Sequence, residues 1–163
     1  MSKSFRVQQI DHVELFVPDR YAAAQWYQEI FGLEIVREVE HWASDPHGPL
    51  MISSDGGNTK LALFEGKGPP LRFRSFIRVR GGGGARETAG YHRVAFRVDR
   101  QGFLAFLDRV KEHRVFAEDG KPQASLEVVD HDSAYSVYFC DPYGNRYEVT
   151  CYDYEFLKNQ LAK

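Results

Sequence analysis

Cysteine is scarce in this sequence, which has only Cys140 and Cys151 among its 163 residues. Two cysteines are too few for a disulfide scaffold, and we expect both thiols to be reduced. No segment approaches the run of about 18 apolar residues that a membrane-spanning helix needs. The first ten residues, MSKSFRVQQI, also lack the apolar stretch of a secretory signal peptide. We therefore expect a cytoplasmic protein without membrane spans.

The sequence also lacks a dominant sign of charge. Its 21 Lys and Arg residues nearly balance its 23 Asp and Glu residues, which leaves a formal net charge of −2. Because proteins that bind nucleic acids are usually basic, this balance argues against a nucleic-acid partner. Hydrophobic residues make up 43% of the chain and aromatic residues 14%. That share is sufficient for a packed core and indicates a folded protein of about one domain.

An internal repeat organises the chain. Residues 12–19 and 93–100 share one pattern, and an offset of 81 (94 − 13) superposes Val13 on Val94. The same offset superposes Leu15 on Phe96. Apolar residues alternate with polar residues in both segments, as in a strand with one buried face.

A helix and further strands are expected after each of these strands. Apolar spacing predicts helices over 21–31 and 102–113, and turns rich in Gly, Asn and Asp precede final strands over 59–65 and 146–152. The other strands are expected near residues 33–39, 50–53, 125–129 and 135–139. Their apolar faces predict a core that includes Val13, Leu15, Val17, Trp26, Ile30, Val94, Phe96, Val98, Phe103, Leu107 and Val110.

The predicted fold is therefore α+β, with two βαβββ half-modules. The first module spans 9–65 and the second 91–153, and a tail follows at 154–163. The linker 66–90 contains alternating arginines at 72–80, which suggest an extra edge strand, and four consecutive glycines at 81–84, which suggest a mobile loop. Since one such half cannot bury both faces of its sheet, we expect two halves to pack together.

Two motifs carry a resemblance to a known family. Asp11-His12-Val13 lies at the start of the first module, and Asp-Pro-Tyr-Gly-Asn-Arg-Tyr-Glu occupies 141–148. Together with the repeat, these motifs resemble the vicinal oxygen chelate superfamily, which includes glyoxalase I, extradiol dioxygenases, fosfomycin-resistance transferases and bleomycin-binding proteins. The resemblance covers roughly residues 9–153 and implies paired mixed sheets that form a cupped site, with the helices outside.

The resemblance also implies positions for metal ligands. His12 matches the first ligand position and Glu148 matches the last. Two imidazoles and a carboxylate on one side of a divalent ion leave open positions for substrate oxygens and O₂ or water. Leu61, which an offset of 87 (148 − 61) pairs with Glu148, is apolar, so the four-ligand site of glyoxalase I is not supported.

The third ligand position leaves two alternatives open. His92 would complete a metal site, but the offset of 81 pairs His12 with Arg93. Since neighbouring strand residues face opposite ways, His92 would need a bulge or a later strand start to join the site. Otherwise an Arg93–Glu148 ion pair replaces the metal in a metal-free site.

Two further residues are candidates for proton transfer. If Cys140 pairs with Arg146 across the turn, Tyr138 lies opposite Glu148 on the same face. Extradiol dioxygenases resemble this chain in having a tyrosine ten residues before the glutamate ligand. Many superfamily members also resemble it in the Asp-His pair that precedes the strand, here Asp130-His131. The resemblance implies that Tyr138 hydrogen-bonds a substrate oxygen and that His131 moves protons.

The resemblance thus implies a metal-dependent oxidoreductase similar to extradiol ring-cleaving dioxygenases, acting on a small aromatic diol. Fe(II) or Mn(II) is the favoured metal, with Zn(II) or Ni(II) as alternatives. Two other functions stay open, a glyoxalase-like lyase or isomerase and a metal-free binding or resistance protein. The expected partner is a small-molecule substrate, and the two modules can pair within one chain or across a homodimer.

Overall fold

The computed structural model describes residues 6–66 and 93–162. The chain divides into two compact units, Met1–Gly68 and Pro69–Lys163. Three predictions concern residues outside the described part of the chain: the edge strand at 72–80, the mobile loop at 81–84 and the role of His92.

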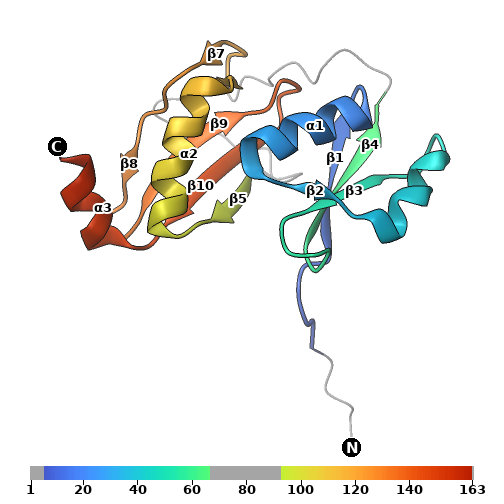
Figure 1. The fold of residues 1–163 in the computed structure, drawn as a ribbon, viewed down its shortest axis with the longest axis horizontal. Helices are drawn as coiled ribbons and strands as arrows, with labels where there is room; N and C mark the ends of the chain where they lie inside the picture. Colours follow the sequence, from blue (N-terminus) through green and yellow to red (C-terminus); the bar gives the residue numbers. More distant parts are fainter. Residues whose placement is uncertain (1–5, 67–92, 163) are drawn as a thin grey trace, which may run out of the picture. The chain divides into compact units, whose positions relative to one another are not determined.

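The first unit consists of a mixed sheet with one long helix (Figure 1). Its elements in chain order are β1 (His12–Val17), α1 (Arg20–Phe31), β2 (Glu34–Ile35), the 3-10 helix η1 (Arg37–Ser44), β3 (Leu50–Ser53) and β4 (Lys60–Glu65). The strands lie in the order β1-β4-β3-β2. β1 runs parallel to β4, and the other pairs are antiparallel.

Local signals define the helix of this unit. The carboxylate of Asp19 accepts hydrogen bonds from the backbone N–H groups of Tyr21 and Ala22, each at 2.9 Å, which caps the first turn. Gly32 ends the helix with a φ of 71°, a left-handed conformation that glycine adopts without strain. Along β1, Leu15 and Val17 are buried while His12 and Glu14 are exposed. The buried set faces the core, and the exposed set belongs to the other face of the sheet.

The second unit repeats this arrangement with additions. Its elements are β5 (Val94–Arg97), α2 (Arg100–Glu112), β6 (Val115–Phe116), β7 (Pro122–Gln123), β8 (Val129–Asp130), β9 (Tyr135–Cys140), β10 (Arg146–Cys151) and α3 (Tyr154–Leu161). The strands lie in the order β5-β10-β9-β6-β7, and β8 pairs with β9 (Figure 1). β5 is parallel to β10, as β1 is to β4.

The predicted α+β class and the strand-helix-strand order of both halves are confirmed. The strand predicted at 125–129 was wrong, because the strand that follows α2 is β6, and only Val129 of the predicted segment is in a strand. The strand predicted at 33–39 shrinks to two residues before η1. The tail at 154–163 forms α3 over most of its length. Two-residue strands have no period of their own, so alternation cannot predict them.

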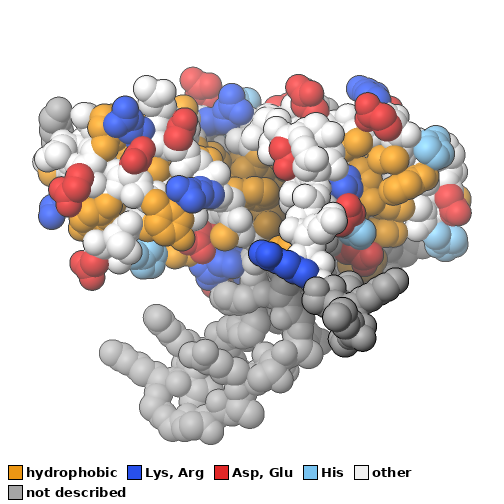
Figure 2. Space-filling model, turned by 90° about the horizontal axis from the view of Figure 1, so that it is seen from below, with side chains coloured by type: hydrophobic (Ala, Val, Ile, Leu, Met, Phe, Trp, Pro, Cys, Tyr) orange, Lys and Arg blue, Asp and Glu red, His pale blue; other side chains and the backbone are white. Residues whose placement is uncertain are grey.

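The core agrees with the predicted apolar faces. Leu15, Val17, Ile30, Phe103 and Val110 are buried, and every other residue predicted for the core is partly shielded rather than exposed. Among the described residues, no helix has the length and apolar character to cross a membrane. On the face seen in Figure 2, acidic and basic side chains are interspersed with apolar ones.

Candidate functional site

Glu148 and Tyr138 lie directly opposite each other on β10 and β9. Their pairing, and that of Cys140 with Arg146, is the register that the turn sequence predicted. Opposite residues of an antiparallel pair share one face of the sheet. The Tyr138 hydroxyl accordingly lies 3.4 Å from Glu148 Oε1 and donates to it. The structure thus places a phenol against the carboxylate of the predicted last ligand position.

Ser136 holds the same carboxylate from the next position on this face. Its hydroxyl donates to Glu148 Oε1 at 2.8 Å and lies 3.0 Å from Thr150 Oγ1. Ser136 is only 1% exposed, so this hydrogen bond is shielded from water. Ser136 is not among the predicted site residues, although the alternation Ser136-x-Tyr138 opposite Glu148 was a signal for it.

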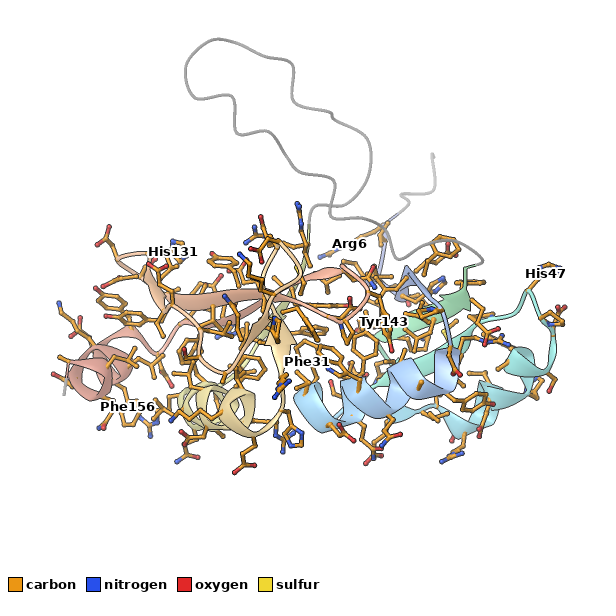
Figure 3. The ribbon with its side chains drawn as sticks, turned by 90° about the horizontal axis from the view of Figure 1, so that it is seen from above. Arg6, Phe31, His47, His131, Tyr143 and Phe156 are labelled. Atoms are coloured by element: carbon orange, nitrogen blue, oxygen red, sulfur yellow. The ribbon has the colours of Figure 1, made fainter. Side chains whose placement is uncertain are left out.

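His131 completes a short chain of polar contacts. Its Nε2 atom lies 2.8 Å from the Tyr138 hydroxyl, and the two rings meet edge to face. His131 is exposed, and Figure 3 shows it on the side of the sheet away from α2. The contacts therefore run from the partly buried Glu148 through Tyr138 to an imidazole that water can reach.

Arg93 lies on the same face as these residues. Its guanidinium carbon is 4.3 Å from the centroid of the Tyr138 ring, a cation–π contact. The parallel register places Ala95 beside Glu148, so Arg93 has the parity of the site face, as the offset of 81 predicts. His92, the competing candidate for the metal, lies outside the described residues.

His12 occupies the first strand of the other unit. Its Nδ1 atom is 2.7 Å from Asp11 Oδ1, and its Nε2 atom is 3.8 Å from Glu14 Oε1. The hydrogen bond with His12, followed by that with Lys60, lowers the pKa of Asp11. A carboxylate that binds one ring nitrogen orients the imidazole and presents the other nitrogen, which is the usual arrangement of a metal-ligating histidine.

The first unit corrects one repeat partner. Val13 pairs with Leu61 on β1 and β4, and Val94 pairs with Tyr147 on β5 and β10. The position that matches Glu148 is therefore Ala62, not Leu61. The offset of 87 was wrong because it aligned the turn asparagines Asn58 and Asn145, and one more residue separates the first of them from its strand. Ala62 is apolar too, so the first unit still offers no carboxylate there.

The loop between the second and third strands of the first unit forms η1. Trp42 is 43% exposed, and its ring meets that of His41 edge to face. Buried Arg20 donates hydrogen bonds to the backbone oxygens of Asp45 and Gly48, which ties this segment to the start of α1. These contacts hold the segment in place, and among the residues that the structure describes no metal-binding group forms around His41.

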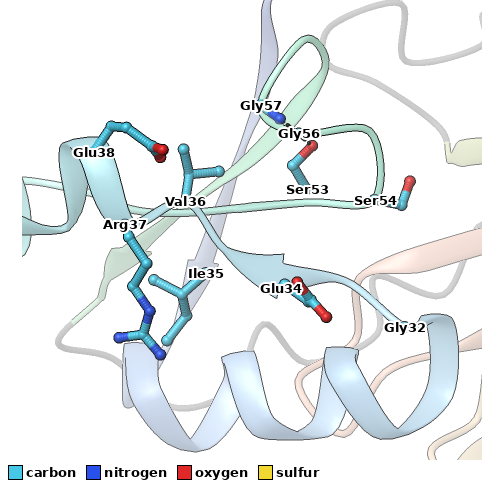
Figure 4. Close-up of a pocket in the computed structure, with 10 residues that line it drawn as sticks. All are labelled: Gly32, Glu34, Ile35, Val36, Arg37, Glu38, Ser53, Ser54, Gly56 and Gly57. Atoms are coloured by element: carbon cyan, nitrogen blue, oxygen red, sulfur yellow. Dashed lines mark hydrogen bonds between the residues drawn. The ribbon is translucent and has the colours of Figure 1, made fainter.

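A crevice of about 370 Å³ lies between β2 and the turn after β3 (Figure 4). Ser53 and Ser54 are among the residues that line it, and the Ser53 oxygen accepts from the Gly57 N–H at 3.0 Å and donates within the same turn. The Ser53 hydroxyl is therefore engaged in the turn and is no activated nucleophile. Burial likewise raises the pKa of the Cys140 thiol to about 12, so that cysteine is no nucleophile either.

Comparison with known proteins identifies the family. The model of the glyoxalase/bleomycin resistance protein/dioxygenase superfamily matches residues 9–149. The chain belongs to this superfamily. Solved structures of the vicinal oxygen chelate type confirm the fold that the two motifs indicated.

Relatives within the superfamily differ in their named activities. The mitochondrial methylmalonyl-CoA epimerase of Bos taurus is 26% identical over 112 residues, which are 69% of this chain and 59% of the epimerase. FosX, a genomically encoded fosfomycin resistance protein from Listeria monocytogenes, has a TM-score of 0.60 at 16% identity, covering 95% of this chain and 99% of its own. The oxidase ChaP-H2 has a TM-score of 0.56 at 21% identity, covering 90% and 94%. These structural likenesses establish the fold alone.

The side chains at the predicted ligand positions fit the chemistry of a divalent metal site. His12 offers its Nε2 atom, because Nδ1 is held by Asp11. Glu148 offers a carboxylate that is oriented by Ser136. Imidazole and carboxylate together suit Fe(II), Mn(II), Ni(II) or Zn(II). Within 6–66 and 93–162, no three His, Cys, Asp or Glu side chains gather closely enough to hold an ion. Whether His12 and Glu148 share one ion therefore stays a prediction.

Proposed function

We propose that this chain is a divalent-metal enzyme of the vicinal oxygen chelate superfamily, similar to the extradiol ring-cleaving dioxygenases, that acts on a small aromatic diol. The observation that carries this proposal is the chain of contacts from Glu148 through the Tyr138 hydroxyl to His131 Nε2, at 3.4 Å and 2.8 Å. An inert binding pocket has no need of a phenol between a carboxylate and an exposed imidazole.

His12, His92 and Glu148 would hold the metal. When bound, a metal with these three ligands supplies a positive centre with open positions for two neighbouring substrate oxygens and for O₂. Ser136 keeps the Glu148 carboxylate in one orientation through its hydrogen bond. That orientation matters because a ligand held in place costs little entropy when the ion binds.

The chain's own groups account for proton movement. The Tyr138 hydroxyl can hydrogen-bond an oxygen of the bound diol, and its contact with His131 provides a second place for the proton. His131 is exposed, so water can reach its imidazole.

A second function is favoured by Arg93. Its guanidinium covers the Tyr138 ring at 4.3 Å, on the face that carries Glu148. In a metal-free binding protein this cation would occupy the place of the metal and hold an anionic ligand with the aromatic rings around it. Metal content separates the two functions.

The deciding experiment measures metal bound per chain after reconstitution with Fe(II), Mn(II), Ni(II) and Zn(II). We expect about one ion per chain in the wild type and none in His12→Ala, because two remaining ligands hold a metal poorly. His47→Ala, which changes an exposed histidine between η1 and β3, is the matched control and should retain the ion. A wild type that binds none of the four metals refutes the enzyme proposal and supports the metal-free protein.

The reaction type requires a second assay. Oxygen uptake with a panel of catechols should be stimulated by the metal-loaded protein and should give ring-cleaved products. Since a curated relative is a methylmalonyl-CoA epimerase, a parallel sample with methylmalonyl-CoA in D₂O tests exchange of the proton next to the carbonyl group. Deuterium uptake without oxygen consumption would overturn the dioxygenase assignment in favour of an isomerase.

A further inference from the structure

The Asp130 carboxylate collects three hydrogen bonds at the base of the loop that carries His131. Its Oδ1 atom accepts from the Asp132 N–H at 2.8 Å. Its Oδ2 atom accepts from the hydroxyls of Tyr135 and Tyr154, each at 3.1 Å. One carboxylate therefore joins the loop, strand β9 and helix α3.

The two tyrosines reinforce this junction by stacking. Their ring centroids are 5.1 Å apart with the rings 8° from parallel. α3, which supplies Tyr154, is anchored by the fully buried Leu157. This helix follows the segment 9–149 that matches the superfamily.

The loop between Asp130 and Ala134 has a conformation that needs such support. Asp132 has a φ of 64°, in the left-handed region that residues other than glycine rarely adopt. The His131 N–H donates to the Ala134 oxygen at 2.9 Å, which closes the loop at its other end. With the backbone held at both ends, the imidazole is directed at the Tyr138 hydroxyl.

We propose that Tyr154 is a positioning residue for the His131–Tyr138 pair and acts through Asp130. The proposal deepens the proposed function and rests on it for the catalytic role of the pair. Tyr154 does not touch the pair itself. It fixes the carboxylate, the carboxylate fixes the backbone at Asp132, and the backbone determines where His131 points.

The charges around Asp130 agree with this arrangement. The Asp132 N–H and the hydroxyl of Tyr135 lower the pKa of Asp130, and Lys158 on α3 acts in the same direction. Burial raises the pKa of Tyr154, so its hydroxyl stays a donor near neutral pH. The carboxylate is thus charged, and both phenols are protonated, under ordinary conditions.

The test substitutes Tyr154→Phe, which removes the hydroxyl and keeps the ring that stacks on Tyr135. The readout is the ¹⁵N chemical shift of His131 Nε2, with Tyr138→Phe as the reference for a lost hydrogen bond. We expect Tyr154→Phe to move this shift from the wild-type value toward the Tyr138→Phe value. In the metal-loaded enzyme, kcat should fall about tenfold with KM unchanged. Tyr152→Phe, which removes an exposed hydroxyl just before α3, is the control and should match the wild type.

A wild-type His131 shift in Tyr154→Phe overturns the proposal, whatever happens to the melting temperature. So does an unchanged kcat in an active enzyme. If Tyr154→Phe does not fold, Asp130→Asn is measured in the same way and decides the proposal. The ¹⁵N shift needs neither metal nor substrate, so failure of the proposed dioxygenase function leaves this test intact.

Discussion

The two units have the same framework but carry their polar residues on different strands. In the second unit Glu148 on β10 faces Tyr138 on β9. The matching pair in the first unit is Ala62 on β4 and Met51 on β3, and both are buried. On the first strands both units carry a basic residue, but of different types. His12 stands on β1, whereas its repeat partner next to β5 is Arg93.

This difference shows which parts of a duplicated scaffold stay alike and which parts differ. The apolar layer under each helix must be kept in both copies, because each sheet packs on its own helix. The opposite faces are free to diverge. The first unit has an imidazole at the start of its sheet, and the second has a carboxylate with two hydroxyls beside it and an exposed imidazole beyond the phenol.

Each unit has an apolar layer under its helix, and substitutions in this layer should lower the unfolding free energy most. Leu63 on β4 and Val149 on β10 are matching, buried positions. Leu63→Ala should cost about 2–5 kcal/mol of unfolding free energy. Val149→Ala removes less volume and should cost about 2 kcal/mol. Denaturant unfolding of both variants checks this, and a negligible effect in either would show that its unit lacks the packed layer described above.

The polar pair Glu148–Tyr138 of the second unit should affect turnover, whereas its apolar counterpart in the first unit, Ala62–Met51, should not. Tyr138→Phe should lower kcat about 100-fold, because the proton donor next to Glu148 is lost. Met51→Leu, the volume-conserving change at the matching position, should leave kcat unchanged. Steady-state kinetics of the metal-loaded variants checks this, and equal activities would remove Tyr138 from the mechanism.

The turns before the last strands differ in depth. Asp141 is fully buried and accepts hydrogen bonds from two backbone N–H groups and the Asn145 amide, at 2.7–2.9 Å. Asp141→Ala leaves these buried donors without an acceptor and should cost about 2 kcal/mol. Asp55, its exposed counterpart, should contribute less when replaced by alanine. Thermal unfolding of both variants gives the comparison, and a larger effect at Asp55 would contradict it.

Acid should act on the exposed turn. The Thr59 N–H, and next the Ser53 hydroxyl, lower the pKa of Asp55 from its ordinary value of 3.8. A carboxyl group whose pKa is lower in the folded than in the unfolded state stabilises the fold above pH 3.8. This stabilisation is lost as the pH falls through the lower pKa of the folded state. The stability difference between wild type and Asp55→Asn should therefore shrink from pH 5 toward pH 2. Urea unfolding at several pH values measures it, and a constant difference would assign the effect to something other than ionisation.

Much of the second unit's site could be predicted from the sequence. The turn at 141–145 and the two-residue alternation were sufficient to place Tyr138 opposite Glu148. Parity also predicted that Arg93 would share their face, which its contact with the Tyr138 ring agrees with. That His12 and Glu148 belong to one site stays a prediction, and metal analysis tests it.

Other features could not be predicted because they depend on contacts between distant segments. The strand β6 has two residues, and it forms only because β9 and β7 supply its hydrogen bonds. The offset of 87 aligned turn residues that differ by one position relative to their strands, so Ala62 was missed. No local pattern links Tyr154 to Asp130, which precedes it by 24 residues.

The sequence by itself determined the repeat, the class of fold, the superfamily and the face on which the residues of the longer strands lie. These properties follow from the two-residue period of strands, the spacing of apolar residues in helices and short turn motifs, all of which act over a few residues. Only the tertiary structure decided which side chains meet, such as Ser136 with Glu148, His131 with Tyr138 and Tyr154 with Asp130. A hydrogen bond requires its donor and acceptor atoms to be positioned to within a few tenths of an ångström. For residues far apart in the sequence, such precision arises only when separate elements pack together.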